Sequence, residues 1–378
     1  MGEISFKVNT KNKENLTLPV LSNSAEYGIV NQEDYFDKKI ANRTDNYYIV
    51  KHNDFVYNPR ISKKAPYGPI RRNTLDTKGL MSPLYYVFRI NDGNYIYLDY
   101  YFKSSKWYKF MYQNGDSGAR SDRFAIKDKI FQMMPISMPN TKEQNKIGQL
   151  IQTLQKLIDL QQRKLRQLKQ LKMVMLQQLF VDKNNQQPNL RFKKFNGNWE
   201  LHKLGDVILD YKKKNNNDLL PVLTSSFQGI EYQEKHFGSK QKHDTSDYNV
   251  LPKEYMTYRN RSDNGYFRFN INKLGIIGIV SKFYPVFTTI NTNKQFLASY
   301  LNYNPRLKNY FKVVSVGTSQ HVLSLKNFKK TNLLFPSKSE QDKIGDFFNL
   351  LNKIIFLQQN KLTQLTTLKK YLLQKMFI

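Results

Sequence analysis

The sequence predicts an α+β protein with two globular domains, built mainly from short strands and loops. Two long helices separate these domains and pair as an antiparallel coiled coil. Three observations predict this fold. Residues 139–180 recur as residues 336–377, apolar residues in both copies repeat every 3.5 positions, and the segment before each copy alternates strand-like runs with Asn, Gly and Pro turns.

The duplication sets the domain organisation. Residues 139–180 read PNTKEQNKIGQLIQTLQKLIDLQQRKLRQLKQLKMVMLQQLF, and residues 336–377 read PSKSEQDKIGDFFNLLNKIIFLQQNKLTQLTTLKKYLLQKMF. The copies align without a gap at a shift of 197. The preceding blocks correspond more loosely, as in LPVLSNS at Leu18–Ser24 and LPVLTSS at Leu220–Ser226. We therefore expect a first globular domain over 1–138, a helix and linker over 139–189, a second globular domain over 190–335 and a C-terminal helix over 336–378.

One segment has no counterpart. The second globular block opens with LRFKKFNGNWELHKL at residues 190–204, whereas Met1 aligns near Leu204. Two readings stay open at this point: a natural start that lacks the prefix, or a shortened chain.

Each repeated block predicts a long helix that presents an apolar seam. Steps of four and three from Ile147, and from Ile344, reach mostly apolar residues, with Gln and Lys at the same two places in each copy. A helix of this length spans roughly 50 Å at about 1.5 Å per residue. We expect the two seams to pair with each other, with Gln161 and Gln358 fixing the register. The alternative is a seam that packs only on its own domain. The predicted pairing residues are Ile151, Leu154, Ile158, Gln161, Leu165, Leu168, Phe348, Leu351, Ile355, Gln358, Leu362 and Leu365.

Further apolar residues lie beside the first seam. Leu150, Leu157, Leu160 and Leu171 widen the apolar face of the helix, and they offer a surface for another protein.

The globular blocks predict strands joined by basic loops. The runs Leu84–Ile90, Tyr95–Leu98 and Ile276–Val280 have strand-like composition. Residues 58–72 read NPRISKKAPYGPIRR, and residues 258–268 read YRNRSDNGYFR.

Composition points to a polyanionic partner. The chain has 378 residues, with 60 Lys plus Arg against 30 Asp plus Glu, for a formal net charge of +30. Aromatic residues make up 14%, which places this charge on folded domains rather than on a disordered tail. The absence of Cys excludes disulfides, thiolate metal sites and cysteine nucleophiles. The start MGEISFKVNT lacks a signal-peptide core and no apolar run approaches a membrane span of about 18 residues, so we expect a cytosolic protein.

The sequence contains none of the catalytic motifs considered below. The sequence holds no GxxxxGK[ST] loop, no HExxH and no Asn/Asp-Pro-Pro-aromatic motif of amino-group methylation, and its five His have no metal-ligand spacing. Asp37-Lys38-Lys39 and Asp76-Thr77-Lys78 have the acidic-x-Lys spacing of nucleases, which arises by chance in a lysine-rich chain. We therefore predict no catalytic residue, cofactor or metal in this chain. An unrecognised nuclease site at Asp37 or Asp76 is the enzyme alternative.

The basic loops suit duplex DNA. Lys and Arg neutralise phosphates, while Arg and Asn or Gln pair with guanine and adenine edges in the major groove. The many Tyr and Phe would suit stacking on unpaired RNA bases, but such residues are more often core. The predicted DNA-binding residues are Asn58, Arg60, Lys63, Lys64, Arg71, Arg72, Arg120, Arg123, Arg259, Asn260, Arg261 and Gln320.

The repeated helix start carries a family resemblance. Pro-x(3)-Glu-Gln-x-Lys-Ile-Gly occurs at Pro139–Gly148 and again at Pro336–Gly345, and Leu-Gln-Gln-x-Lys-Leu occurs at Leu160–Leu165 and Leu357–Leu362. The segment LRFKKFNGNWELHKLGD at Leu190–Asp206 resembles a lead-in to a recognition domain. Together these features resemble the specificity subunit of a type I restriction-modification system, over essentially the whole chain.

The resemblance implies a division of labour. Two target-recognition domains would each read one half of a split DNA site, and the helices would form the spacer that sets the gap. Two modification subunits would supply AdoMet-dependent adenine methylation. Two restriction subunits would supply ATP-driven translocation and cleavage, with magnesium also on the partner subunits. The specificity subunit itself would be non-catalytic. The alternative is a non-catalytic scaffold that binds nucleic acid without sequence preference.

Overall fold

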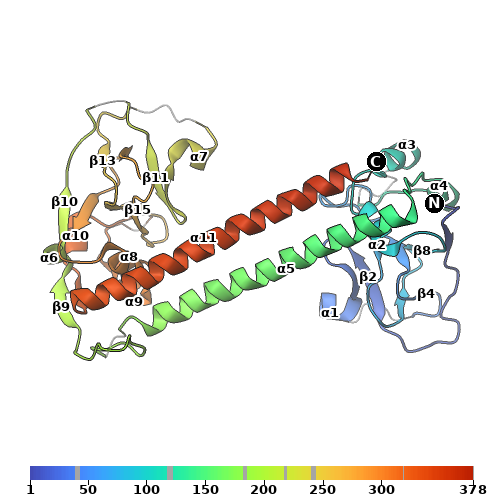
Figure 1. The fold of residues 1–378 in the computed structure, drawn as a ribbon, viewed down its shortest axis with the longest axis horizontal. Helices are drawn as coiled ribbons and strands as arrows, with labels where there is room; N and C mark the ends of the chain where they lie inside the picture. Colours follow the sequence, from blue (N-terminus) through green and yellow to red (C-terminus); the bar gives the residue numbers. More distant parts are fainter. Residues whose placement is uncertain are drawn as a thin grey trace. The chain divides into compact units, whose positions relative to one another are not determined.

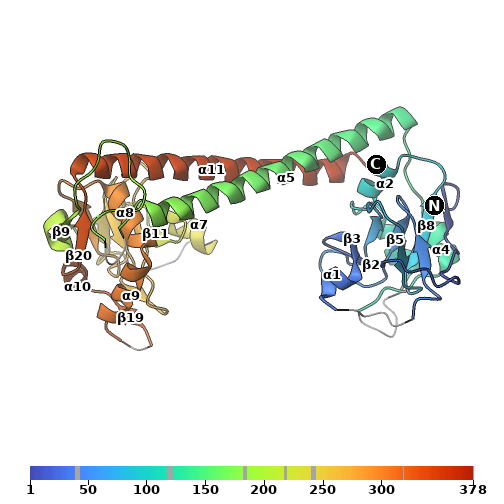
Figure 2. The ribbon, with the colours of Figure 1, turned by 90° about the horizontal axis from the view of Figure 1, so that it is seen from below.

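The fold consists of two compact units. The computed structural model describes residues 1–38, 43–116, 122–181, 185–216, 219–239, 244–317 and 319–377. Unit 1 comprises Met1–Gln162 with Asn360–Ile378, and unit 2 comprises Arg163–Gln359. Each unit therefore contains one globular domain and a part of both long helices (Figure 1 and Figure 2).

The two long helices are α5, Thr141–Gln178, and α11, Lys338–Lys375, drawn in green and red in Figure 1. Neither contains proline, and each starts at a polar cap. Asn140 Oδ1 accepts from the Glu143 N–H at 3.0 Å, and Ser337 Oγ accepts from the Glu340 N–H at 3.4 Å. These side chains satisfy N–H groups that have no partner within the helix.

Within each unit the helix segments run antiparallel. In unit 1, Ile147 and Ile151 near the start of α5 share a core with Phe377, just beyond the end of α11. In unit 2, Phe180, just beyond the end of α5, stacks on Phe348 near the start of α11 with ring centroids 5.9 Å apart. The predicted α+β fold with an antiparallel helix pair is confirmed.

The globular part of unit 1 holds two four-stranded sheets. One has the order β1-β8-β5-β6, with every pair antiparallel. The other has the order β3-β2-β7-β4, in which β2 and β7 are parallel. The elements are β1 Ser5–Lys7, β2 Val20–Ser24, β3 Gly28–Asn31, α1 Gln32–Phe36, β4 Tyr48–Val50, β5 Phe55–Tyr57, β6 Ile70–Arg72, β7 Gly79–Met81, β8 Tyr86–Ile90, α2 Tyr95–Tyr101, α3 Tyr108–Asn114 and α4 Asp128–Gln132.

Unit 2 repeats this plan. Its sheet β10-β18-β14-β16 matches β1-β8-β5-β6 strand for strand, and the pairs β11-β12 and β13-β17 match the second sheet. Two further pairs, β15-β19 and β20-β9, complete the unit. The elements are β9 Glu200–Lys203, α6 Leu204–Val207, β10 Ile208–Tyr211, β11 Leu223–Ser226, β12 Gly229–Tyr232, α7 Gln233–Phe237, β13 Asn249–Leu251, β14 Met256–Tyr258, β15 Arg261–Ser262, β16 Phe269–Ile271, β17 Gly278–Val280, β18 Val286–Thr289, α8 Lys294–Tyr303, α9 Pro305–Val314, β19 His321–Val322, α10 Leu325–Lys329 and β20 Asn332–Phe335.

The strand prediction is wrong at one of the three runs. Strands β8 and β17 lie inside the predicted runs Leu84–Ile90 and Ile276–Val280, but Tyr95–Leu98 begins helix α2. The Asn94 side-chain oxygen accepts from the N–H groups of Ile96 and Tyr97 at 2.8 and 2.9 Å, which starts the helix. This cap overrides the strand preference of the aromatic run.

Aromatic side chains fill both cores. The largest fully buried side chains are all aromatic, and they include Trp107 and Phe88 in unit 1 and Trp199 and Phe287 in unit 2. These rings form the interior of the domains, as expected for most of the Tyr and Phe. In the part of the chain that the structure describes, no helix combines the length and apolarity needed to span a membrane.

Candidate nucleic-acid interface

The predicted DNA-binding loops occupy the same structural position in both units. In unit 1 the loop after β5 forms an antiparallel bridge between Arg60 and Arg123. In unit 2 the loop after β14 becomes β15, which pairs with β19 and sets Arg261 opposite Val322. Matching hydrogen bonds hold the two loop pairs, from the Phe124 N–H to the Pro59 carbonyl and from the Leu323 N–H to the Asn260 carbonyl. In each unit, two loop segments about 60 residues apart in the sequence therefore pair with each other in the same arrangement.

A buried tyrosine anchors each loop pair. The Tyr57 hydroxyl donates to the Phe124 carbonyl at 3.4 Å, and the Tyr258 hydroxyl donates to the Leu323 carbonyl at 3.0 Å. Burial raises the pKa of both tyrosines above the ordinary value, so both stay protonated donors at neutral pH.

The unit 1 loop presents three basic side chains to solvent. The Arg60 side chain is 72% exposed, and its Nε lies 3.7 Å from an Asp122 carboxylate oxygen. Lys63 is exposed as well, and Lys64 pairs with Glu26 at 2.8 Å while remaining 64% exposed. Exposed ion pairs of this kind are weak, so a phosphate can compete for these cations. A groove of about 470 Å³ lined by Tyr35, Phe36 and these basic residues runs beside the loop.

Three other predicted residues turn into the fold. Asn58 is buried, and its side-chain amide donates to the Asn23 carbonyl at 2.9 Å. Arg71 donates to the Ala25 carbonyl at 2.8 Å, and burial lowers its pKa. Arg72 donates to Asn53 Oδ1 at 2.7 Å. These contacts hold the strands beneath the loop in place, and a direct role in DNA contact stays a prediction for all three. Arg123 is half-buried, and Arg120 lies outside the described residues.

In unit 2 the predicted residues are arranged differently. Arg259 is exposed, while the Arg261 guanidinium carbon lies 3.8 Å from the centre of the Phe283 ring. Gln320 donates to Asp263 Oδ1 at 3.3 Å. The side-chain oxygen of Asn260 is buried, with no hydrogen-bond partner among the described residues. The stacked arginine is held at a fixed place, which suits a planar contact with a base or phosphate.

The predicted helix-pairing residues face inward. Ile151, Leu154, Ile158, Gln161, Leu165, Phe348 and Leu351 are buried, and Leu168, Ile355, Gln358, Leu362 and Leu365 are half-buried. The residues beside the seam behave differently, since Leu150, Leu157, Leu160 and Leu171 are 47%, 48%, 63% and 43% exposed.

The lysines in the seam have a role that sequence reasoning missed. In unit 2 the Lys172 ammonium donates to Asn352 Oδ1 at 2.6 Å and to the Tyr303 hydroxyl at 3.0 Å. In unit 1 Lys369 donates to Gln155 Oε1. Lys172 and Lys369 are equivalent positions of the repeat, as are Asn352 and Gln155. Each unit therefore contains one such polar pair at the same position of the repeat. The sequence signal for it was the lysine that interrupts the apolar seam at the same place in both copies.

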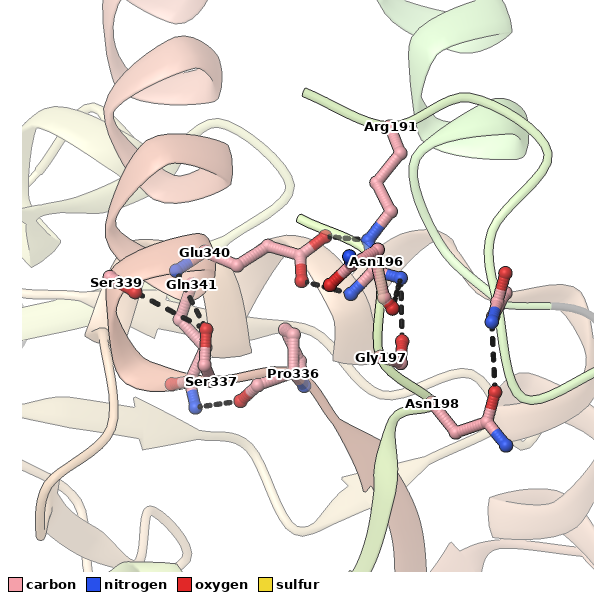
Figure 3. Close-up of polar contacts among 10 residues, drawn as sticks. Arg191, Asn196, Gly197, Asn198, Pro336, Ser337, Ser339, Glu340 and Gln341 are labelled. Carbon is pink, nitrogen blue, oxygen red and sulfur yellow. Dashed lines mark hydrogen bonds and ion pairs between the residues drawn. The ribbon is translucent and has the colours of Figure 1, made fainter. Parts of the chain in front are cut away.

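The repeated Gln of the helix start ties each helix to its domain. Gln144 accepts from the Asn94 N–H at 2.9 Å and donates to the Pro139 carbonyl at 2.7 Å. Gln341 makes the same two bonds, with the Asn293 N–H at 3.1 Å and the Pro336 carbonyl at 3.0 Å, the latter drawn in Figure 3. Each Asn also caps a short helix, α2 or α8. The motif is thus a clamp between two helix starts.

The two acidic triplets do not form a cluster. Asp37 ends helix α1 with φ of 53°, and Asp76 is exposed in a different loop. Across the described ranges, no group of three or more His, Cys, Asp or Glu is arranged to hold a metal ion.

Comparison with known families and structures supports one relationship. Residues 196–367 match the family model described as the type I restriction modification DNA specificity domain. No curated protein matches the chain. A crystal structure of the S subunit of a type I restriction-modification system from M. genitalium is 15% identical, covers 90% of this chain and 86% of its own, and has a TM-score of 0.54. That likeness shows a shared fold.

Two other solved structures are also similar over the full chain. One is the HsdS subunit from Thermoanaerobacter tengcongensis, with 13% identity, coverage of 100% of this chain and 95% of its own, and a TM-score of 0.46. The other comes from work on complex assembly and conformational transition of the type I R-M system, with 14% identity, coverage of 100% and 96%, and a TM-score of 0.48. The second half of the chain thus matches the type I restriction modification DNA specificity domain, and the repeat that relates the two halves extends this likeness to the first half.

Proposed function

We propose that this chain reads a bipartite DNA site without catalysing any reaction itself. Each globular domain contacts one half-site, and the paired helices set the gap between the half-sites. The observation that carries the proposal is the repeated loop pair, Arg60 with Arg123 and Arg261 with Val322, which presents basic side chains from the same position of each domain.

The charge distribution supports a nucleic-acid partner. The exposed Arg60, Lys63 and Arg259 lie on these loops, in a chain of net charge +30. Cations in such loops gain affinity by releasing counterions from phosphates, and Arg adds base readout in the major groove. The loop sequences differ between the domains, so each domain reads its own half-site.

The catalytic steps, methylation and cleavage, belong to partner subunits in this proposal. Two modification subunits bind the chain and supply AdoMet-dependent adenine methylation. Two restriction subunits supply ATP- and magnesium-dependent translocation and cleavage. The exposed leucines beside the α5 seam are candidates for partner contacts, because apolar side chains in water are costly unless another surface covers them.

Methylation mapping tests the proposal. The chain is co-expressed with modification subunits, and the genome is sequenced for modified adenines. We expect one split motif, methylated on both strands and lost when this chain is omitted. An assembled, AdoMet-competent complex that leaves no motif would refute sequence-specific reading. It would favour the scaffold alternative, which binds random duplexes with equal affinity.

A further inference from the structure

The loop pair of unit 2 is a small three-stranded ladder, whose strand β19 is labelled in Figure 2. Arg261 in β15 lies opposite Val322 in β19, and Val322 lies opposite Val316 on its other side. The Val316 N–H donates to the Val322 carbonyl at 3.0 Å, and the Val322 N–H donates to the Val316 carbonyl at 2.8 Å. Residues directly opposite one another in antiparallel strands project from the same face. Arg261, Val322 and Val316 therefore form one row across the ladder.

This row faces away from the domain core. Leu323, the neighbour of Val322, is fully buried, and successive residues of a strand point to opposite faces. Val322 is half-buried, and Val316 at the edge of the ladder is 68% exposed. The outward row thus consists of one arginine followed by two β-branched apolar residues.

Both ends of the row are held in place. The Arg261 guanidinium carbon lies 3.8 Å from the centre of the Phe283 ring. The turn after Val316 needs a glycine, because Gly317 has φ of 104° and a Cβ there would lie 2.3 Å from the Gln320 carbonyl oxygen. A surface that is already ordered loses little conformational freedom when a ligand binds to it.

Cations flank the exposed valine. Arg259 and Lys312 are exposed, and the Lys312 side chain lies against Gly265 in the turn between β15 and β16. The carboxylate of Asp263 accepts a hydrogen bond from the Gln320 side-chain amide at 3.3 Å. An apolar contact between cations matches the major groove of DNA, where phosphates line the edges and the apolar group on the base edges is the C5 methyl of thymine.

Unit 1 carries different chemistry at the same place. Arg123 is the equivalent of Val322, since each precedes the residue whose carbonyl accepts from the anchoring tyrosine, Phe124 or Leu323. Arg123 lies opposite Arg60, whereas Val322 lies opposite Arg261. The first domain therefore presents two arginines where the second presents an arginine and a valine, as expected for domains that read different half-sites.

We propose that Val316 and Val322 contact the C5 methyl of a thymine in the half-site read by unit 2, beside the base that Arg261 contacts. This inference rests on the proposed function and adds the class of base that the second domain selects. Two strand spacings of about 4.8 Å separate Arg261 from Val316. The thymine therefore lies within about three base pairs, at about 3.4 Å each, of the base that Arg261 contacts.

The test replaces thymidine with deoxyuridine, which removes the methyl group and leaves the base pairing unchanged. The complex of this chain with modification subunits is titrated with duplexes that carry its mapped motif, with the thymines replaced one at a time. We expect one replacement, in a single half-site, to weaken binding about fourfold, as for the loss of one buried methyl group. Val316→Ala should bind the unmodified duplex about as weakly, and the same replacement should cause no further loss.

A matched truncation serves as the control. Val313 is 81% exposed on helix α9, outside the ladder, so Val313→Ala should keep the fourfold difference between the two duplexes. In the other half-site, thymine replacement should have the same effect on the parent and on Val316→Ala. Because Val316 is exposed, its truncation should leave the fold intact.

Three results would overturn the contact. Equal sensitivity to the replacement in the parent and in Val316→Ala would mean that the methyl group acts through the shape of the duplex. Loss of the difference in Val313→Ala, with Val316→Ala unaffected, would place the contact on α9. Poorer assembly of Val316→Ala with the modification subunits would identify the row as a protein contact.

Failure of this inference is distinguishable from failure of the proposed function. A parent complex that prefers its motif to a scrambled duplex, yet responds to no thymine replacement, would refute the methyl contact alone. A parent complex that binds both duplexes equally would refute sequence-specific reading, and the methyl contact with it.

Discussion

In the unit 1 loop, the basic side chains exposed to solvent are different residues from those that hold the loop in place. Arg60, Lys63 and Lys64 point into solvent, whereas Arg71 and Arg72 bond to carbonyl and amide oxygens within the fold. Truncating the first three should therefore change binding without unfolding the domain.

We expect the triple change Arg60→Ala, Lys63→Ala and Lys64→Ala to weaken recognition of one half-site only. Each lost phosphate contact should flatten the salt dependence of binding by about 0.9 in log–log slope. The measurement is binding to duplexes with either half-site scrambled, over a range of salt. Lys142→Ala, Lys146→Ala and Lys156→Ala, exposed on α5, remove the same charge and serve as the control. Equal loss at both half-sites would argue against independent reading.

Buried tyrosines make the protein sensitive to alkaline pH. Burial and the nearby Asp99 carboxylate raise the pKa of Tyr100 to about 12, and burial likewise raises the pKa of Tyr86 and Tyr97 to about 12. In the unfolded chain these groups ionise near pH 10. The stabilisation from keeping them neutral is thus complete below pH 10 and is lost between pH 10 and about 12.

Tyr100→Phe isolates one of these groups. Between pH 10 and 12 each such tyrosine should cost about 1.4 kcal/mol of stability per pH unit. The variant should therefore lose stability less steeply than the parent in that range, with little difference at pH 8. Denaturant unfolding at a series of pH values measures this, and parallel curves from pH 8 to 11.5 would contradict it.

At the scale of elements, the repeated glycine has different surroundings in the two helices, at Gly148 in α5 and at Gly345 in α11. A Cβ on Gly345 would fall on the Asn293 side-chain oxygen, which caps helix α8. A Cβ on Gly148 would lie 3.2 Å from both Ile96 Cγ2 and the Tyr97 backbone nitrogen, a tight approach but a looser one than at Gly345. Gly345→Ala should therefore displace a cap.

We expect Gly345→Ala to destabilise unit 2 by about 1–2 kcal/mol, the usual loss for an N-cap. Gly148→Ala should cost less, because Ala favours the helix and the nearest atoms would lie at 3.2 Å, whereas at Gly345 the nearest atom would lie at 2.2 Å. Hydrogen exchange of α8 and α2 reports the two sites separately. A larger effect at Gly148 would show that the Asn293 clamp is not the limiting contact.

The polar pairs of the coiled coil specify its register. Lys172 with Asn352 and Lys369 with Gln155 satisfy one another only when the helices are aligned as they are in each unit. With leucine at both lysine positions, Asn352 and Gln155 lose their lysine partners in the native register as well, so the native alignment loses this advantage over a shifted one.

Lys172→Leu with Lys369→Leu should therefore broaden the register, with some loss of stability because Asn352 and Gln155 are left without their lysine partners. The chain has no Cys, so spin labels on cysteines placed at exposed Lys169 and Lys353 report one distance in unit 2. The parent should give one narrow distance, and the variant a second population displaced by about 10 Å, one heptad. A single unchanged distance would mean that the apolar residues alone set the register.

At the scale of the whole molecule, the sequence predicted the parts that depend on periodicity. The duplication, the seam and the family motif follow from spacing, and two matching seams in one chain favour the antiparallel helix pair. The inward turn of Arg71 and the clamp between Gln144 and Asn94 did not follow, because they join positions that only the folded chain brings together. Tyr95–Leu98 was misread because one capping Asn outweighed the composition of four residues.

The spacer role makes a quantitative prediction. One heptad inserted into both α5 and α11 keeps the seam in phase and lengthens the pair by about 10.5 Å, at 1.5 Å per residue. If the helices set the gap between half-sites, the methylated motif should gain about three base pairs of spacer, at 3.4 Å each. The half-site sequences should stay the same, because the recognition loops are untouched. Methylation mapping of the co-expressed complex gives both numbers at once. A heptad inserted into α5 alone breaks the match between the two seams and should abolish methylation, whereas an unchanged spacer in the doubly extended chain would refute the ruler role of the helices.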